Sequence, residues 1–174
     1  MSFLELIQKR KSVRQFLPQD LSTEVVNKFI QVALLAPTGK QKNHWDFICV
    51  QNKEMRTSLA KCKPHGAAMI ERAPLAIVVI GDPTLSDTWI EDCSIASIYL
   101  QLAATDMGLG SCWIQVDKRE YNATISADNY IKQLLDIPEH KKVLSVLALG
   151  YADSENKPAT RQRDYSNQVH YEKF

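Results

Sequence analysis

Residues 87–107 read DTWIEDCSIASIYLQLAATDM, and this stretch sets the expected architecture. Apolar side chains from Ile90 to Met107 cover most of the circumference of a helix. A helix that is apolar nearly all round lies in the interior of a protein. Gly108 follows at once and is a typical residue at the end of a helix. The sequence therefore predicts one long helix at the centre of the core.

Four short runs elsewhere in the chain predict strands. Leu75–Ile80 and Val143–Leu149 are continuously aliphatic, which is typical of strands buried on both faces. Trp45–Val50 and Cys112–Val116 are rich in residues that favour strands. Further helices are predicted from Phe3 to Lys9-Arg10-Lys11, from a cap at Ser22 or Thr23 to Leu34, and over residues 53–62, 66–72 and 128–136. Helices and strands thus alternate in one layered α/β or α+β domain.

Length and composition agree with a globular domain. The chain has 174 residues, 45% of them hydrophobic, and a formal net charge of +1. We expect a single domain over residues 1–174, with an extended tail from about residue 152. The near-neutral charge argues against nucleic acid as a partner. The four cysteines form no CxxC pair, which argues against a metal site or a disulfide framework: Cys49, Cys62, Cys93 and Cys112.

The sequence also bears on location. Met1-Ser2-Phe3-Leu4-Glu5 lacks the basic-then-apolar pattern of a signal peptide. No apolar run reaches the roughly 20 residues that span a bilayer. Free cysteines fit a reducing compartment. We therefore expect a cytoplasmic protein without a membrane partner.

The first cluster that could bind a ligand is Arg10-Lys11-Ser12-Val13-Arg14. Arginine and serine together offer the positive charge and the several donors that a phosphate requires. Arg14 lies beyond the others and could reach another part of the same ligand. The alternative is that these cations only complement the C-terminal end of a helix.

The second cluster is the loop from Ala36 to Trp45, which contains the amide side chains of Gln41 and Asn43. Because amides both donate and accept hydrogen bonds, the pair could recognise a mixed edge such as the pyrimidine end of a flavin. An ordinary helix-to-strand loop is the alternative, since proline, threonine and glycine are common in such loops.

Two further segments are informative. Residues 108–113, GLGSCW, begin like GxGxxG, but Trp113 replaces the last glycine and the segment follows a helix, which excludes a Rossmann dinucleotide site. Arg161 and Arg163 stand two residues apart, so in an extended chain they point the same way. They could complete a phosphate site or simply keep a tail soluble.

Taken in order along the chain, these segments resemble the nitroreductase family of flavoproteins. The matching segments are Arg10-Lys11-Ser12-Val13-Arg14-Gln15-Phe16, Ala36-Pro37-Thr38-Gly39, Trp45-Asp46-Phe47, Ala73-Pro74, Gly108-Leu109-Gly110-Ser111-Cys112-Trp113 and Leu149-Gly150-Tyr151. The resemblance implies a three-layer α/β/α sandwich of the α+β class, with a mixed, mainly antiparallel sheet. It also implies an intertwined homodimer with one FMN per subunit at the interface.

The resemblance further implies a role for each matching residue. Arg10 and Ser12 are similar to ligands of the FMN phosphate or ribityl chain, with Lys11 beside them. Arg14 is similar to the cation near flavin N1 and O2, where it would stabilise the reduced flavin. Pro37, Thr38 and Gly39 are similar to a loop that the partner subunit lays over the isoalloxazine, and Gln41 and Asn43 are similar to the polar end of that loop. Ile114, Gln115 and Val116 are similar to a strand whose backbone faces flavin N5. Arg161 and Arg163 are similar to tail cations on the phosphate.

The chain departs from the family pattern in two places. The family loop commonly reads Asn-x-Gln-Pro, whereas this chain has Gln41-Lys42-Asn43-His44. There is also no clear lysine before Ala73-Pro74, where some members place one that is directed at the flavin.

The function implied by the resemblance is an FMN-dependent oxidoreductase. Electrons would pass from NAD(P)H to the flavin and then, in a second half-reaction of a ping-pong cycle, to a nitroaromatic, a quinone or a similar small acceptor. No side chain need act as acid or base, because the protein positions and tunes the cofactor. Two alternatives stay open: a non-catalytic FMN-binding redox sensor or carrier, and an anion-binding module that uses the basic clusters without flavin.

Overall fold

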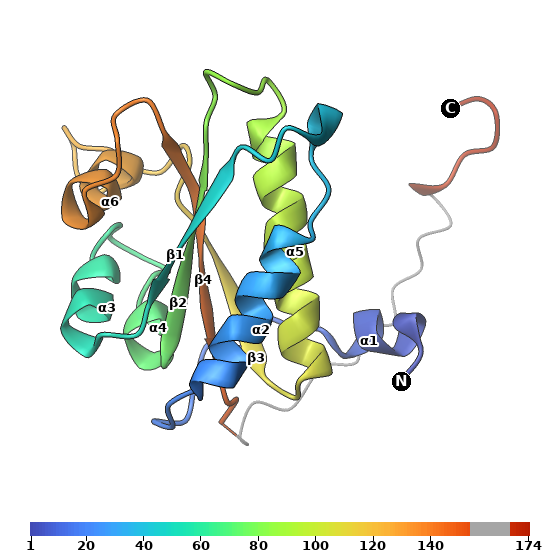
Figure 1. Ribbon diagram of the computed structural model, residues 1–174, viewed down its shortest axis with the longest axis horizontal. Coiled ribbons are helices and arrows are strands. Elements are labelled where there is room, and N and C mark those ends of the chain that lie inside the picture. The colour runs from blue at the N-terminus through green and yellow to red at the C-terminus, as the bar shows by residue number, and fades with distance from the viewer. Residues whose placement is uncertain (154–167) are drawn as a thin grey trace.

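A four-stranded sheet forms the middle layer of the computed structural model, which describes residues 1–153 and 168–174 (Figure 1). Its strands are β1 (Trp45–Val50), β2 (Leu75–Gly81), β3 (Gly110–Gln115) and β4 (Lys142–Gly150). The spatial order is β1-β2-β4-β3, and every neighbouring pair is antiparallel. Strands β1 and β3 are therefore the two edges of the sheet, and β2 and β4 are its buried centre.

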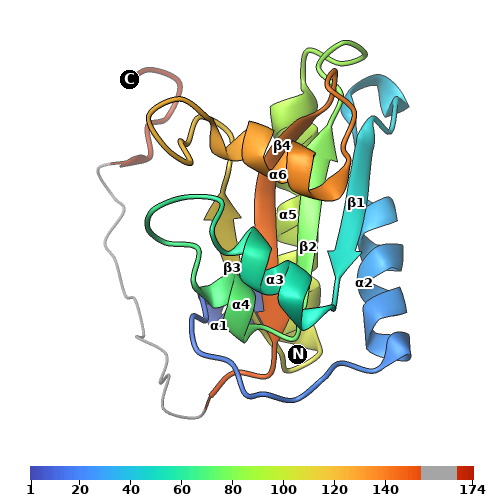
Figure 2. The same ribbon diagram turned by 90° about the vertical axis from the view of Figure 1, so that its left-hand side faces the viewer.

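Helices cover both faces of this sheet (Figure 2). On one face lie α2 (Thr23–Leu34) and α5 (Trp89–Asp106), and on the other lie α3 (Lys53–Leu59), α4 (Met69–Arg72) and α6 (Ala127–Leu135). Helix α1 (Phe3–Lys9) contacts α5, and a short 3-10 helix (Gly39–Gln41) precedes β1. The predicted three-layer sandwich of the α+β class is confirmed. The four strands are wholly antiparallel, and the one parallel bridge within residues 1–153 and 168–174 joins Ser12 to Ser111.

The long central helix is confirmed as α5. Its Ala96, Leu100 and Ala104 are fully buried against the sheet and α2. Gly108 has a φ of +73°, so the chain turns out of the helix at the expected residue. The apolar residues of α5 show no single face, because Ile98 and Tyr99 on its other side are also apolar and are exposed in this subunit.

Some predicted boundaries are wrong, for local reasons. The strand predicted to start at Cys112 starts at Gly110, because Gly110 has no side chain and a Cβ there would lie 2.8 Å from Val13. The helix predicted over residues 66–72 is limited to Met69–Arg72, since Gly66 has a φ of +75°, outside the helical range. The helix predicted over residues 53–62 ends at Leu59.

The segment after α1 runs along the outer edge of β3. The backbone N–H of Val13 donates to the backbone oxygen of Ser111 at 2.8 Å, and Phe16 forms an antiparallel bridge with Ala152. Both Val13 and Phe16 are buried. This pairing fixes residues 10–14 beside β3, although they belong to no strand themselves.

Candidate functional site

The outer edge of β3 exposes backbone groups at alternate residues. The N–H of Val116, just after the strand, donates to the backbone oxygen of Leu144 at 3.0 Å, so this residue points toward β4. Peptide groups alternate in direction along a strand. Those of Ser111, Trp113 and Gln115 therefore point away from the sheet.

Two contacts close this edge at its ends and leave its middle open. The backbone N–H of Val13 donates to the backbone oxygen of Ser111, and the Nζ of Lys63 donates to the backbone oxygen of Gln115 at 3.0 Å. No described residue accepts a hydrogen bond from the backbone N–H of Trp113 or of Gln115. From Ser111 to Gln115 the strand rises about 13 Å, which is long enough for a flat ring system to lie along it.

Positive charges lie at both ends of this open edge. Burial raises the pKa of the Cys112 thiol, and the charges of Arg14 and Lys63 offset part of that increase. Both cations are therefore near Cys112. Arg14 follows Val13, which contacts Ser111, and Lys63 contacts Gln115. The guanidinium of Arg10 donates to Oε1 of the buried Gln101 on α5 at 3.2 Å, which holds Arg10 on the α5 side of the same edge.

A buried hydroxyl without a partner lies beside these cations. Ser111 is 1% exposed, and its Oγ has no hydrogen-bond partner among the described residues. Ser111 also forms the parallel bridge with the exposed Ser12. Because an unsatisfied buried hydroxyl is costly, this position suits a ligand that carries polar atoms.

Lys63 is the candidate site residue that the sequence does not reveal. It lies in the loop between α3 and α4, ten residues before Ala73, and no motif surrounds it. Its ammonium is half-buried, and that desolvation lowers its pKa, with repulsion from Arg119 adding to the effect. The tertiary contact with Gln115 shows that Lys63 reaches the edge of β3.

The loop expected at the ring of a ligand lies elsewhere in this subunit. The N–H of Gly39 donates to Oδ1 of Asp92 at 2.8 Å, at the start of α5. Within the loop, the hydroxyl of Thr38 donates to Oδ1 of Asn43 at 3.1 Å and accepts from its N–H at 3.0 Å. Gln41 and Asn43 are exposed and have φ values of +54° and +53°.

The predicted residues therefore form two separate groups. Arg10, Lys11, Ser12 and Arg14 lie with residues 114–116 at the β3 edge, whereas Pro37, Thr38, Gly39, Gln41 and Asn43 precede β1 at the opposite edge (Figure 2). Three strand spacings, about 14 Å, separate these edges. Of the three residues predicted to face flavin N5, Gln115 directs its peptide group away from the sheet. Ile114 and Val116 direct theirs toward β4. Arg161 and Arg163 lie outside the described residues.

Residues 1–153 and 168–174 contain neither a metal-binding cluster nor a membrane-spanning helix. No group of three or more His, Cys, Asp or Glu side chains is arranged to hold a metal ion. No helix in these ranges is both long and apolar enough to cross a membrane.

Known proteins resemble this chain along its whole length. A model of the nitroreductase family matches residues 7–65 and 60–151. A solved FMN-dependent nitroreductase from Clostridium difficile R20291 is 40% identical, with a TM-score of 0.94, and the match covers 99% of this chain and 100% of that one. A protein of Methanothermobacter thermautotrophicus, provisionally named NADH dehydrogenase/NAD(P)H nitroreductase, is 36% identical over 100% of this chain and 88% of its own length. An Archaeoglobus fulgidus protein with the same provisional name is 35% identical over 98% of each chain.

Proposed function

Because this chain belongs to the nitroreductase family, we propose that it is an FMN-dependent oxidoreductase that uses NAD(P)H to reduce nitroaromatic, quinone or similar small acceptors. The observation that carries the proposal is the open stretch of β3 between the contacts of Val13 and Lys63. The printed names of the Clostridium difficile structure and of the archaeal relatives support FMN and NAD(P)H respectively.

The residues at the β3 edge suit the two ends of FMN. Arg10, Lys11 and Ser12 offer charge and donors for the phosphate and the ribityl chain, and we propose that Arg161 and Arg163 join them. The unpartnered Oγ of Ser111 lies next to this group. A phosphate would therefore meet several donors at once.

The middle of the edge suits the ring. The outward N–H groups of Trp113 and Gln115 can donate to ring heteroatoms, while Arg14 and Lys63 place positive charge at either end. FMN, when bound, would accept a hydride from NAD(P)H and pass the electrons to the acceptor in a separate half-reaction. The chain's own contribution is to bind, orient and tune, and no side chain is assigned as acid or base.

A homodimer explains how the second group of predicted residues reaches the same ligand. Within one subunit, Pro37, Thr38 and Gly39 precede β1, and three strand spacings, about 14 Å, separate β1 from β3. Residues of a second copy could complete the site. Exposed apolar side chains on and beside α1, α2 and α5 offer the contact surface: Phe3, Leu4, Ile7, Leu34, Leu35, Ile98 and Tyr99.

The same surface contains an apolar groove. Its volume is about 490 Å³, and it is lined by Phe3, Leu6, Val32, Tyr99 and Leu102 among others. A contiguous exposed apolar patch of this kind is typical of a subunit interface. We further infer a cytoplasmic location, because all four cysteines are free thiols.

An absorption spectrum of the purified protein tests the proposal, followed by anaerobic titration with NADH and with NADPH. We expect an FMN spectrum that bleaches on titration and recovers when a quinone or nitroaromatic is added. Colourless protein that cannot be loaded with FMN would contradict the proposal. Bound FMN without NAD(P)H oxidation would favour a redox sensor or carrier instead.

A further inference from the structure

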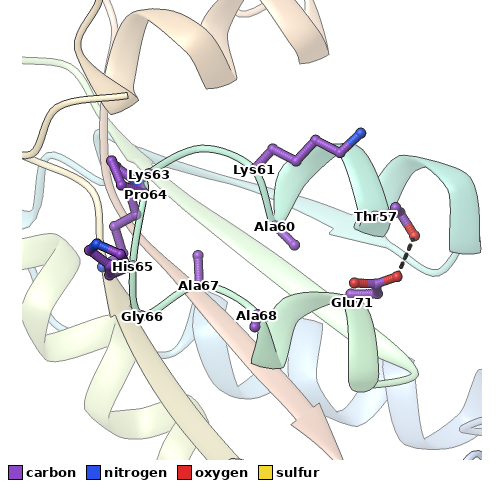
Figure 3. Close-up of a pocket in the computed structure, with 10 residues that line it drawn as sticks. All are labelled: Thr57, Ala60, Lys61, Lys63, Pro64, His65, Gly66, Ala67, Ala68 and Glu71. Carbon is purple, nitrogen blue, oxygen red and sulfur yellow. Dashed lines mark hydrogen bonds between the residues drawn. The ribbon is translucent and has the colours of Figure 1, made fainter. Parts of the chain in front are cut away.

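The loop between α3 and α4 encloses a cavity next to the open edge of β3 (Figure 3). Its volume is about 340 Å³, within the range of small-molecule sites. Thr57 and Glu71 lie on the helices that flank it, and Lys61, Lys63 and His65 lie on the loop. Lys63 belongs to both the cavity and the open edge of β3, since it lines the cavity and donates to the backbone oxygen of Gln115.

The charges around this cavity are mostly positive. Glu71, the one carboxylate among the described lining residues, accepts a hydrogen bond from the hydroxyl of Thr57 at 3.4 Å. No described Asp or Glu lies within ion-pair distance of Lys61, Lys63 or Arg119. The described part of the chain therefore leaves this positive charge uncompensated.

Lys63 can bind a second group while it stays on β3. An ammonium has three donors, and the contact with Gln115 uses one of them. The side chain is half-buried, where charge–charge attraction is stronger than in water. An anion in the cavity would thus meet a positioned donor at the end of the edge where the ring is proposed to lie.

We propose that Lys63 is a specificity-determining residue, which makes the site favour small acceptors that carry a carboxylate. The proposal rests on the proposed function, because Lys63 is beside the reacting ring only if FMN lies along β3. The carboxylate of the acceptor would contact the ammonium of Lys63, and its reducible group would then face the ring.

The test compares two acceptors that differ mainly in charge, 4-nitrobenzoate and 4-nitrobenzamide. We expect Lys63→Gln to lower the ratio of their kcat/KM values, carboxylate over amide, by about tenfold or more, which corresponds to one charge-assisted hydrogen bond. Lys61→Gln, on the same loop but with an exposed side chain, should leave the ratio unchanged. Lys63→Arg should retain most of the preference.

Calorimetric titration with benzoate and benzamide gives a second measurement that does not depend on turnover. Benzoate should bind about tenfold or more tightly than benzamide to the wild type, and Lys63→Gln should abolish this difference. Equal binding of the two by the wild type, or an equal loss of preference in Lys61→Gln, would overturn the proposal.

Two controls separate this proposal from neighbouring ones. The kcat/KM ratio is measured on FMN-loaded protein, because Lys63 also lies beside the proposed ring and its replacement can lower FMN content or overall turnover without changing the ratio. Wild-type protein that binds no FMN would refute the proposed function itself. If Lys63→Gln instead raises the KM for NADH or NADPH and keeps the benzoate preference, Lys63 binds a phosphate of the co-substrate and the acceptor assignment is wrong.

Discussion

The backbone N–H of Gly39 donates to Oδ1 of Asp92, and this contact fixes the loop before β1 on the first turn of α5. Asp92 is 4% exposed, and its other oxygen accepts from the hydroxyl of Thr88 at 3.2 Å. A Cβ on Gly39 would collide with Thr88, so the loop approaches the helix as closely as a glycine permits.

Replacing this carboxylate should loosen the loop. Asp92→Ala removes the acceptor and leaves buried donors unsatisfied, so we expect the free energy of unfolding to fall by about 2–3 kcal/mol. Urea unfolding measures the change. Glu91→Ala, at the neighbouring exposed carboxylate, should alter stability by less than about 0.5 kcal/mol. Equal effects of the two substitutions would show that the Asp92 contact does not stabilise the fold.

The contact between Gly110 and Val13 should matter for the cofactor. In Gly110→Ala the new Cβ would lie 2.8 Å from Val13, which must move away from β3. We expect a loss of about 1–3 kcal/mol in stability and weaker FMN binding, measured by fluorescence titration of the apoprotein. Gly108→Ala introduces strain at a φ of +73° but meets no neighbour within 4 Å, so it should lose stability and keep its FMN affinity.

Arg10 should distinguish FMN from riboflavin. Arg10→Gln removes a charged donor from the proposed phosphate site, so we expect the Kd for FMN to rise roughly 10- to 100-fold. The Kd for riboflavin, which has no phosphate, should change little. Arg72→Gln is the matched control, because Arg72 bonds to Gln15 on the exposed surface. Similar losses for both flavins would place Arg10 away from the phosphate.

Alkaline pH should weaken the fold through the buried thiol of Cys62. Burial raises its pKa from 9.0 to about 11, so the folded state keeps its proton while the unfolded state ionises. Stability from this thiol is fully present below pH 9 and is lost as pH rises toward 11, on the order of 2 kcal/mol in total. Urea unfolding from pH 8 to pH 10.5 should show a shallower decline in Cys62→Ala than in the wild type. Parallel declines would refute this assignment.

The proposed dimer should depend on α5. Ile98 is 38% exposed on that helix, and Ile98→Glu would bury an unpaired carboxylate in the interface, at a cost of several kcal/mol. We expect a monomer in sedimentation experiments and, because the site then lacks its partner loop, a loss of FMN. Ala123→Glu makes an equal change of charge in the exposed loop before α6 and should stay dimeric. A dimer that tolerates Ile98→Glu would exclude this face.

The sequence predicts the layers of the fold better than its site. The aliphatic run at Leu75–Ile80 and the all-round apolar pattern of α5 depend on burial alone, and burial is visible in residue order. The start of β3 depends instead on the close approach of Gly110 to Val13, which is far away in the chain. The hydrophobic periodicity of the sequence contains no information about contacts between residues so far apart in the chain.

The site shows the same limit. The basic cluster at residues 10–14 is local, so its composition alone is enough to predict the proposed anion site. Lys63 has no such signal, because its relevance comes from a bond to Gln115, which is 52 residues away. Likewise, the separation of Thr38 from Arg10 follows from the strand order, which no local motif specifies.

The contacts of Val13 and Lys63 on β3 also bear on aggregation. An edge strand with free peptide groups is a template on which a strand of another chain can add. Here both ends of the edge are blocked, and the open part between them is shorter than the five or six residues of a typical strand. A flat ligand can enter this gap, whereas a β-strand cannot. The chain can thus keep one edge of its sheet accessible to a small molecule without exposing it to polymerisation.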